Sequence, residues 1–399
     1  MPELKKSLHS KTRKSLSQIG RSAIRQFDQE VSSIPGILKL TLGEPDLDTP
    51  DHIKDALISA VQQNQSHYAA AAGNIELRTA ISNYLKKVNK IKYNPNSEII
   101  VTVGATEAIY SSMTSLLESG DGVIIPTPAF PLYSAVAIVN DAVPIEVDTS
   151  NTDFVLTPDV LEDALQHNPN TKMVVLNYPT NPTGVTYSRQ QLAALAKVLK
   201  KYSVFVLVDE IYCELNFGAE HASITEFIPD QTILINGVSK SYAMTGYRVG
   251  YLAAPKQVVT NILKLHGFAV TTVPTTIMVA ATEAIEHGDA DIIRMKQIYS
   301  KRRDYIVTEF KKMGFSLASP QGAFYLFAKI PDGFPQNSRT FAVDLAQNGK
   351  LALVPGVVFG PGGEGYVRLS YAASMDHLKE AVSRMHTYLN NWRKNNESN

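Results

Sequence analysis

The apolar residues in the middle of the chain fall into short, nearly continuous runs separated by longer amphipathic stretches. Such runs are typical of strands buried on both faces of a parallel sheet. They are EIIVTV (98–103), DGVIIP (121–126), TKMVVLN (171–177), SVFVLVD (203–209) and TILING (232–237). Helical patterns lie between them, over Thr106–Leu117, Pro158–Gln166 and Ser188–Lys201, with Ser188 as the expected N-cap of the last. This alternation predicts an open α/β sheet whose ligands gather at the carboxyl ends of its strands.

The pattern changes near residue 290. One long charged helix is expected over Asp291–Met313, followed by strand-like pieces around Gly322–Ala328 and Gly365–Tyr371. We therefore expect a large domain over residues 46–290, built on a mostly parallel sheet flanked by helices, and a smaller α+β domain over residues 291–399. Residues 1–45 hold no predicted sheet of their own and are expected to pack against the smaller domain.

Composition narrows the class of protein. The chain has 399 residues, which is enough for two domains and a buried ligand site. Its 38 basic side chains balance 38 acidic ones, so no net field favours nucleic acid. No apolar stretch approaches the roughly eighteen residues that a membrane span needs. Small-molecule chemistry is therefore expected, with neither a nucleic-acid nor a membrane partner and with no metal.

The N-terminal segment and the single cysteine indicate the cellular compartment. Cys213 is the single cysteine and cannot form an internal disulfide. The N-terminus MPELKKSLHSKTRKSL is basic but lacks the apolar stretch of a secretory signal. A cytoplasmic location is the default expectation.

The strongest local motif is SKSYAMTGYRVGY (239–251), which follows the run TILING and contains Lys240 and Arg248. A lysine amine attacks an aldehyde only when it is partly neutral, which a desolvated pocket favours, and a guanidinium binds phosphate oxygens in a bidentate way. Two exposed loop cations are the alternative interpretation.

Two further motifs follow predicted strands. In VLVDEIY (206–212), Asp209 ends an apolar strand, where a carboxylate needs a cationic partner such as a protonated pyridine nitrogen. A strand-end cap is the alternative role for Asp209. In NYPTNPTG (177–184), prolines and a glycine fix a turn that could orient the amide of Asn181, although Asn-Pro turns are also common without any function.

On these motifs, in this order and spacing, the chain resembles the class I and II aminotransferases of the fold-type I pyridoxal-phosphate superfamily. The resemblance runs from LTLGEPDLDTP (40–50) to GYVRLSYA (365–372). It implies that Lys240 forms a Schiff base with pyridoxal 5'-phosphate and then acts as the acid-base catalyst of amino-group transfer. It also implies that Asp209 pairs with the pyridine nitrogen, while Asn181 and Tyr212 donate hydrogen bonds to the phenolic oxygen of the cofactor.

The resemblance assigns the phosphate to Arg248 and to Gly104, Ala105 and Thr106, in a turn where a helix begins. Thr106 is also consistent with an ordinary N-terminal helix residue. Many relatives carry a phosphate-binding serine three residues before the lysine, but here that position is Gly237, and a hydroxyl directly precedes the lysine at Ser239. Some bacterial aspartate-specific relatives have a lysine where this chain has Thr106, so the sequence leaves the preferred amino acid open among aromatic, aspartate, glutamate and diaminopimelate-type substrates.

The resemblance also implies a stacking ring and a shared active site. Phe130 matches the aromatic residue that stacks on the cofactor ring. Tyr68 matches a tyrosine that reaches the phosphate of a neighbouring subunit, which implies a homodimer. Arg368 matches the arginine that binds the substrate α-carboxylate, with Asn181 and the backbone of Gly43 lining the same place.

Two other functions are compatible with such a scaffold. One is a pyridoxal-phosphate-dependent β-lyase that cleaves the C–S bond of a sulfur amino acid, since fold and cofactor residues do not decide which bond breaks. The other is an amino-acid sensor, although such regulators usually carry a DNA-binding domain, for which the residues before GEPD leave little room. Transfer of an amino group between an amino acid and a 2-oxo acid is the expected activity.

Overall fold

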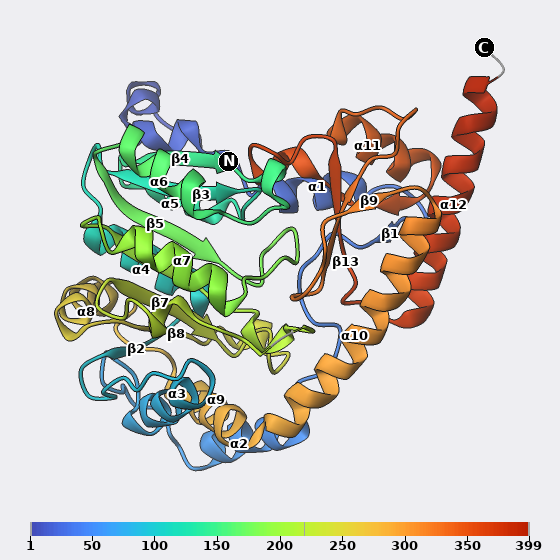
Figure 1. Ribbon diagram of the computed structural model, residues 1–399. Helices are drawn as coiled ribbons and strands as arrows, with labels where there is room; N and C mark the ends of the chain where they lie inside the picture. The colour runs from blue at the N-terminus through green and yellow to red at the C-terminus, as the bar shows by residue number, and fades with distance from the viewer. Residues whose placement is uncertain (1, 219, 398–399) are drawn as a thin grey trace.

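A mostly parallel sheet dominates the fold. The computed structural model describes residues 2–218 and 220–397, and within them the largest sheet has seven strands in the order β2-β8-β7-β6-β5-β3-β4. The strands are β2 (Ile99–Thr102), β3 (Gly122–Thr127), β4 (Val143–Asp148), β5 (Thr171–Asn177), β6 (Phe205–Asp209), β7 (Thr232–Gly237) and β8 (Gly250–Ala253). β8 is antiparallel to both of its neighbours, and the other pairs are parallel. The predicted α/β class is confirmed (Figure 1).

All five apolar runs form strands of this sheet, but β4 and β8 were not predicted. The residues of β4 are half-buried or exposed, because it lies at the edge of the sheet, so its sequence VPIEVD lacks a continuous apolar run. β8 has four residues and overlaps the motif read as a lysine- and arginine-bearing loop. The edge strand β4 has too few buried positions to leave a clear apolar pattern, whereas the four residues of β8 are all buried but too few to stand out at the end of the motif.

Helices cover both faces of the sheet, because successive strand residues point to opposite sides. On one face Val174 and Val206 pack with α3 (Ile75–Val88), α6 (Pro158–His167), α7 (Arg189–Leu199) and α9 (Thr275–His287), and α2 (Asp51–Gln62) lies against α9. On the other face Val175 and Leu207 pack with α4 (Gly104–Leu116), α5 (Leu132–Val139) and α8 (Lys256–Val270).

The predicted helices over the middle of the chain are present with small shifts at their ends. α7 starts where expected: Ser188 is its N-cap and forms a capping box with Gln191. α4 starts two residues earlier than predicted, at Gly104, which places the helix start directly at the turn assigned to phosphate.

The C-terminal part builds a smaller antiparallel sheet in the order β12-β13-β10-β9. Its strands are β9 (Ser316–Leu317), β10 (Tyr325–Lys329), β12 (Val354–Pro355) and β13 (Tyr366–Ser370), which pack with α10 (Asp289–Lys312), α11 (Ser338–Asn348) and α12 (Met375–Glu397). Figure 1 shows α10 running from the side of α9 to the small sheet. This long charged helix begins two residues before its predicted start.

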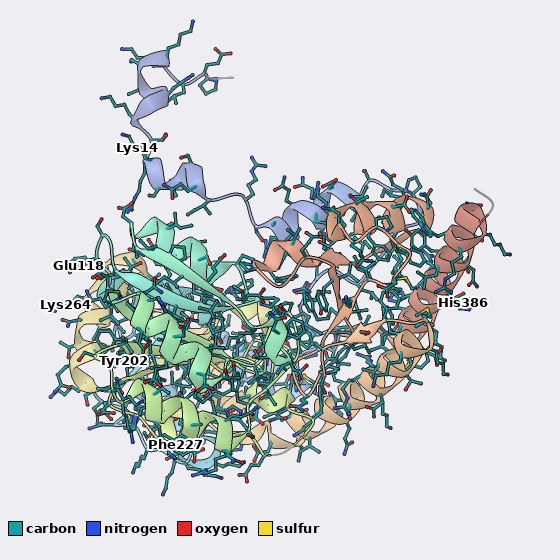
Figure 2. All side chains as sticks on the ribbon, turned by 45° about the horizontal axis from the view of Figure 1, so that its top comes forward. Lys14, Glu118, Tyr202, Phe227, Lys264 and His386 are labelled. Carbon is teal, nitrogen blue, oxygen red and sulfur yellow. The ribbon has the colours of Figure 1, made fainter. Side chains whose placement is uncertain are left out.

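The N-terminal residues join the small sheet region. β1 (Leu38–Lys39) pairs in parallel with β11 (Leu351–Ala352), and Phe27 of α1 (Ala23–Val31) packs against α11. The segment around Lys14 lies on the other side, near α5, and projects from the body of the molecule (Figure 2). None of the helices in the described residues is long and apolar enough to cross a membrane.

Candidate active site

The carboxyl ends of β5, β6 and β7 bring the predicted residues to one edge of the large sheet. Asn177 and Asp209 end β5 and β6 and are paired in register, and the side-chain amide of Asn177 donates to the carbonyl of Asp209 over 2.9 Å. Lys240 follows the last residue of β7 by three positions. This edge is where ligands bind in open α/β sheets.

The amine of Lys240 is held inside the protein. Its Nζ donates to the carbonyl of Gly43 over 2.7 Å and lies 5.9 Å and 5.8 Å from the ring centres of Tyr212 and Phe324. Burial lowers the pKa of Lys240 to about 8, although the nearby Glu44 acts in the opposite direction. With that pKa, about a tenth of the amine is neutral at pH 7, which makes it a nucleophile.

The position that supplies this carbonyl has room only for a glycine. A Cβ at this position would lie 1.9 Å from the hydroxyl of Tyr325. That hydroxyl in turn lies 2.7 Å from the hydroxyl of Tyr212. Burial and the neighbouring Tyr325 raise the pKa of Tyr212 well above its usual range, so Tyr212 keeps its proton and can donate it in a hydrogen bond.

Asp209 is a buried carboxyl group with few partners. Tyr133 donates its hydroxyl proton to Asp209 Oδ2 over 2.8 Å, and the backbone amide of Ile211 donates to Oδ1 over 3.1 Å. Burial raises the pKa of Asp209 to about 6, against the opposing effect of the Tyr133 hydrogen bond. A cation placed beside this carboxyl would favour its ionised form, which is the property expected of a partner for a pyridinium.

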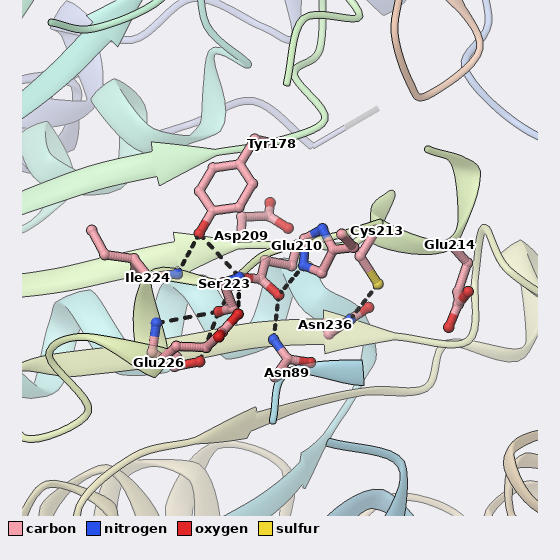
Figure 3. A network of polar contacts seen from close by, with 12 residues as sticks. Asn89, Tyr178, Asp209, Glu210, Cys213, Glu214, Ser223, Ile224, Glu226 and Asn236 are labelled. Atoms are coloured by element: carbon pink, nitrogen blue, oxygen red, sulfur yellow. Dashed lines mark hydrogen bonds and ion pairs between the residues drawn. The ribbon is translucent and has the colours of Figure 1, made fainter. Parts of the chain in front are cut away.

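The next residue, Glu210, fixes the end of β6 through hydrogen bonds on the side opposite to Asp209. Its carboxylate is fully buried and is surrounded by four polar side chains (Figure 3). They are Asn89 at 2.6 Å, His221 at 2.9 Å, Tyr178 at 3.1 Å and Ser223 at 2.5 Å. These hydrogen bonds satisfy the buried oxygens of Glu210, and the network fixes the backbone that carries Asp209.

Arg368 lies on β13, and its guanidinium reaches Asn181. Nη1 donates to Asn181 Oδ1 over 2.9 Å, and Nη2 donates to the carbonyl of Thr41. The guanidinium lies 4.6 Å and 5.1 Å from the ring centres of Tyr325 and Phe359. Its Nε is buried and has no hydrogen-bond partner in the part of the chain that the structure describes, where no carboxylate forms an ion pair with Arg368 either. A buried guanidinium with a spare donor is suited to bind a carboxylate ligand.

The start of α4 faces a second guanidinium. Gly104 has a φ of +77°, and a Cβ there would lie 2.5 Å from Nη2 of Arg248, so the side chain of Arg248 lies over the helix start. Nη1 of Arg248 donates to the carbonyl of Thr245 over 2.8 Å. The first amides of a helix have no partner inside the helix and, with the helix dipole, favour an anion such as phosphate.

The remaining predicted residues differ in their surroundings. Ser239 is buried next to Lys240, and Phe130 is half-buried with its ring edge-on to Tyr133 at 6.1 Å. Thr106 is exposed in the first turn of α4. Tyr68 is 87% exposed, so its side chain stands on the surface of its own chain.

Sequence reasoning missed two of the tyrosines that touch the predicted groups. Tyr325 lies in the run GAFYLF and looks like a core residue there. Tyr133 follows Phe130 by three residues, and this spacing in FPLY was the signal that could have drawn attention to it. The contact between Tyr325 and Tyr212 joins residues 113 positions apart, which no local pattern reveals.

Comparison with known proteins agrees with this geometry. The profile of the family "Aminotransferase class I and II" matches residues 35–385. A probable N-acetyl-LL-diaminopimelate aminotransferase of Bacillus subtilis is 44% identical over 372 residues, which are 93% of this chain and 94% of the relative. An aspartate aminotransferase of Pyrococcus horikoshii is 38% identical over 92% of this chain and 94% of its own length. The structure of the aspartate aminotransferase from Thermus thermophilus with maleate superimposes with a TM-score of 0.89 at 31% identity, covering 94% of this chain and 99% of that one.

The chain belongs to the class I and II aminotransferases, and it is a transaminase. The resemblance noted in the sequence is thereby confirmed. Members of this family use pyridoxal 5'-phosphate, and the residues present fit that group. The buried Lys240 amine has a lowered pKa, Asp209 forms no ion pair within the described residues, and Gly104 leaves room for Arg248 over a helix start.

Proposed function

We propose that this protein transfers the amino group of an L-amino acid to a 2-oxo acid with pyridoxal 5'-phosphate attached to Lys240. The observation that carries the proposal is the position of the Lys240 amine. It is partly neutral, it lies near the rings of Tyr212 and Phe324, and its one hydrogen bond within the described residues is to a backbone carbonyl. A lysine in these surroundings is available for imine chemistry rather than for a structural ion pair.

When bound, pyridoxal 5'-phosphate supplies an aldehyde carbon and an electron-withdrawing ring. Arg248 and the amides of Gly104, Ala105 and Thr106 would hold its phosphate, with Ser239 beside them. Asp209 would hold the ring nitrogen in its protonated form, and Phe130 would cover the ring. Tyr212 and the amide of Asn181 would donate to the phenolic oxygen.

The substrate would be oriented through the groups that all amino acids share. Arg368 would bind the α-carboxylate, with Asn181 and the backbone of Gly43 beside it, and this clamp orients the bond from Cα to its hydrogen. Nζ of Lys240 would then remove the Cα proton as a general base. The related proteins named above include enzymes for aspartate and for a diaminopimelate derivative, whose common part is this α-amino acid group.

We also propose a homodimer with shared active sites. Tyr68 and Phe268 are 87% and 95% exposed on neighbouring segments of the chain. Large apolar side chains exposed in this way are typical of subunit interfaces. For the division of the chain we propose the predicted boundaries of the two domains, 46–290 and 291–399, because the two large sheets lie within these ranges. Within residues 1–45, α1 and β1 pack on the smaller part, whereas the segment around Lys14 lies near α5 of the larger part. The cytoplasmic location stays a prediction.

Reduction with borohydride tests the attachment site. After incubation with pyridoxal 5'-phosphate and reduction, peptide mapping should find the pyridoxyl group on Lys240. Lys240→Ala should lose the label, whereas Lys301→Ala, which removes an exposed lysine, should keep it. A label on another lysine would contradict the proposal.

A single-turnover experiment tests the reaction. An amino acid alone should bleach the absorbance of the lysine-bound cofactor and release one 2-oxo acid per site, and 2-oxoglutarate should restore the absorbance. Steady-state kinetics should then be ping-pong. Continuous release of product from a sulfur amino acid without any 2-oxo acid would indicate a β-lyase instead.

A further inference from the structure

The loop that carries Tyr68 is held by the segment where α8 ends and α9 begins. Three side chains of this segment reach backbone carbonyls of the loop. His266 Nε2 lies 2.9 Å from the carbonyl of Ala71, Thr272 donates to that of Ala70 over 3.2 Å, and Thr275 donates to that of His67 over 2.7 Å. The backbone of the loop is therefore fixed while the side chain of Tyr68 stands free on the surface.

The segment contains a strained residue, which shows how firmly it is held. Thr271, at the end of α8, has φ +64° and ψ −64°, a conformation that β-branched residues rarely adopt. The amide of Thr271 donates to the carbonyl of Gly267, and the amide of Thr272 donates to that of Val270 over 2.7 Å. Strain of this kind persists where surrounding contacts over-determine the backbone.

The other ring nitrogen of His266 faces α4. Nδ1 lies 3.1 Å and 3.2 Å from the two carboxylate oxygens of Glu107, in the first turn of the helix. Glu107 also accepts from the amide of Val103 over 3.1 Å and from the hydroxyl of Ser111. The ring of His266 is fully buried, so it bridges the α4 start and the Tyr68 loop without access to solvent.

The link between α4 and the Tyr68 loop depends on both ring nitrogens of His266. The two ring nitrogens of His266 point to opposite sides of the ring, so one imidazole reaches Glu107 and the carbonyl of Ala71 at the same time. Glu107 is also held by the amide of Val103 and the hydroxyl of Ser111, so the ring joins the Tyr68 loop to a fixed point at the start of α4.

We propose that His266 is a positioning residue. It fixes the phosphate-binding turn at the start of α4 and the Tyr68 loop in position relative to each other. Because Tyr68 serves the neighbouring subunit, each His266 supports cofactor binding in its own site through Glu107 and in the partner's site through Ala71. The inference rests on the proposed function, namely on phosphate at the start of α4 and on a Tyr68 shared between subunits.

The first test measures cofactor affinity rather than activity. Apoenzyme of His266→Gln is titrated with pyridoxal 5'-phosphate, followed by the absorbance of the lysine-bound cofactor. A glutamine amide carries both of its N–H groups on one nitrogen and cannot span two acceptors that lie on opposite sides of the His266 ring. The dissociation constant should therefore rise about tenfold or more. Thr282→Val is the matched control, because it removes a side-chain hydrogen bond within α9 away from the loop, and it should leave the affinity unchanged.

Hybrid dimers with one working Lys240 separate the effect of His266 on its own chain's site from its effect on the partner's site. In the first hybrid, His266→Gln sits in the chain with the working Lys240, and the partner carries Lys240→Ala. In the second, one chain carries both His266→Gln and Lys240→Ala, and the working site belongs to a wild-type chain. Both hybrids should bind the cofactor several-fold more weakly than a hybrid of wild type with Lys240→Ala.

Normal affinity in either hybrid overturns the proposal. Thr275→Val provides a second probe if His266→Gln folds poorly, since it loosens only the loop and should weaken only the partner's site. Complementation between Tyr68→Ala and Lys240→Ala chains tests the shared site by itself. If those chains complement and the second hybrid is still normal, the link through His266 is wrong while the shared site stands.

Discussion

At the residue scale, the chemistry of the candidate site comes from taking ionisable groups out of water. Lys240 and Asp209 lie at the same edge of the sheet, and burial shifts both pKa values toward neutrality, downward to about 8 and upward to about 6. In each case burial disfavours the charged form. The site is therefore prepared for an aldehyde and a pyridinium, whose binding would restore the interactions that these groups lack.

The lowered pKa of Lys240 predicts how fast the apoenzyme takes up its cofactor. Only the neutral amine attacks an aldehyde, so the attachment rate should rise about tenfold per pH unit below pH 8 and level off above it. An ordinary lysine would show this rise up to about pH 10. Stopped-flow absorbance between pH 6 and 10 measures the profile.

Glu44 supplies the control for this profile, because its charge raises the pKa of Lys240. Glu44→Gln should move the midpoint to lower pH without abolishing attachment. A midpoint near 10 in both proteins would contradict the view that burial activates the amine.

At the scale of elements, the position three residues before Lys240 shows how strand packing selects a residue. Gly237 pairs with Gly250 across β7 and β8. A Cβ at Gly237 would lie 2.8 Å from the carbonyl of Val249 and 2.9 Å from the Cα of Gly250. The glycine that replaces the serine of many relatives is thus required by the close approach of the two strands.

This packing predicts that a serine at position 237 destabilises the protein. Gly237→Ser should lower the free energy of unfolding by about 1 to 3 kcal/mol, because the added atoms must push β7 and β8 apart. Urea denaturation of the apoenzyme measures the loss. Gly20→Ser is the control, since no atom lies within 4 Å of a Cβ at that position. A serine variant that is as stable as the wild type and binds cofactor more tightly would show that the strands adapt.

At the scale of the whole molecule, the exposed Tyr68 connects the site to assembly. Tyr68 and Lys240 belong to one chain, yet Tyr68 is 87% exposed on it, as expected if it completes the site of a partner.

Mixed dimers of Tyr68→Ala and Lys240→Ala chains should therefore regain activity, because one of the two sites then has both an intact lysine and an intact tyrosine. Activity of the hybrid should reach up to about half of the wild-type value per dimer, since one site in two is complete. Co-expression with two affinity tags isolates the hybrid, and each parent dimer serves as its control. A hybrid no more active than its parents would place Tyr68 in its own chain's site.

The sequence by itself determined the α/β class, five strands of the large sheet, two strands of the small sheet and the family. These follow from short apolar runs and from motifs of adjacent residues such as VLVDEIY and SKSYAMTGYR. Only the tertiary structure decided the partners of those motifs. Tyr325 meets Tyr212, Thr41 meets Arg368, and His266 joins Glu107 to Ala71. These contacts depend on how the two sheets and the helices pack, and a hydrogen bond between residues far apart leaves no periodicity in the chain.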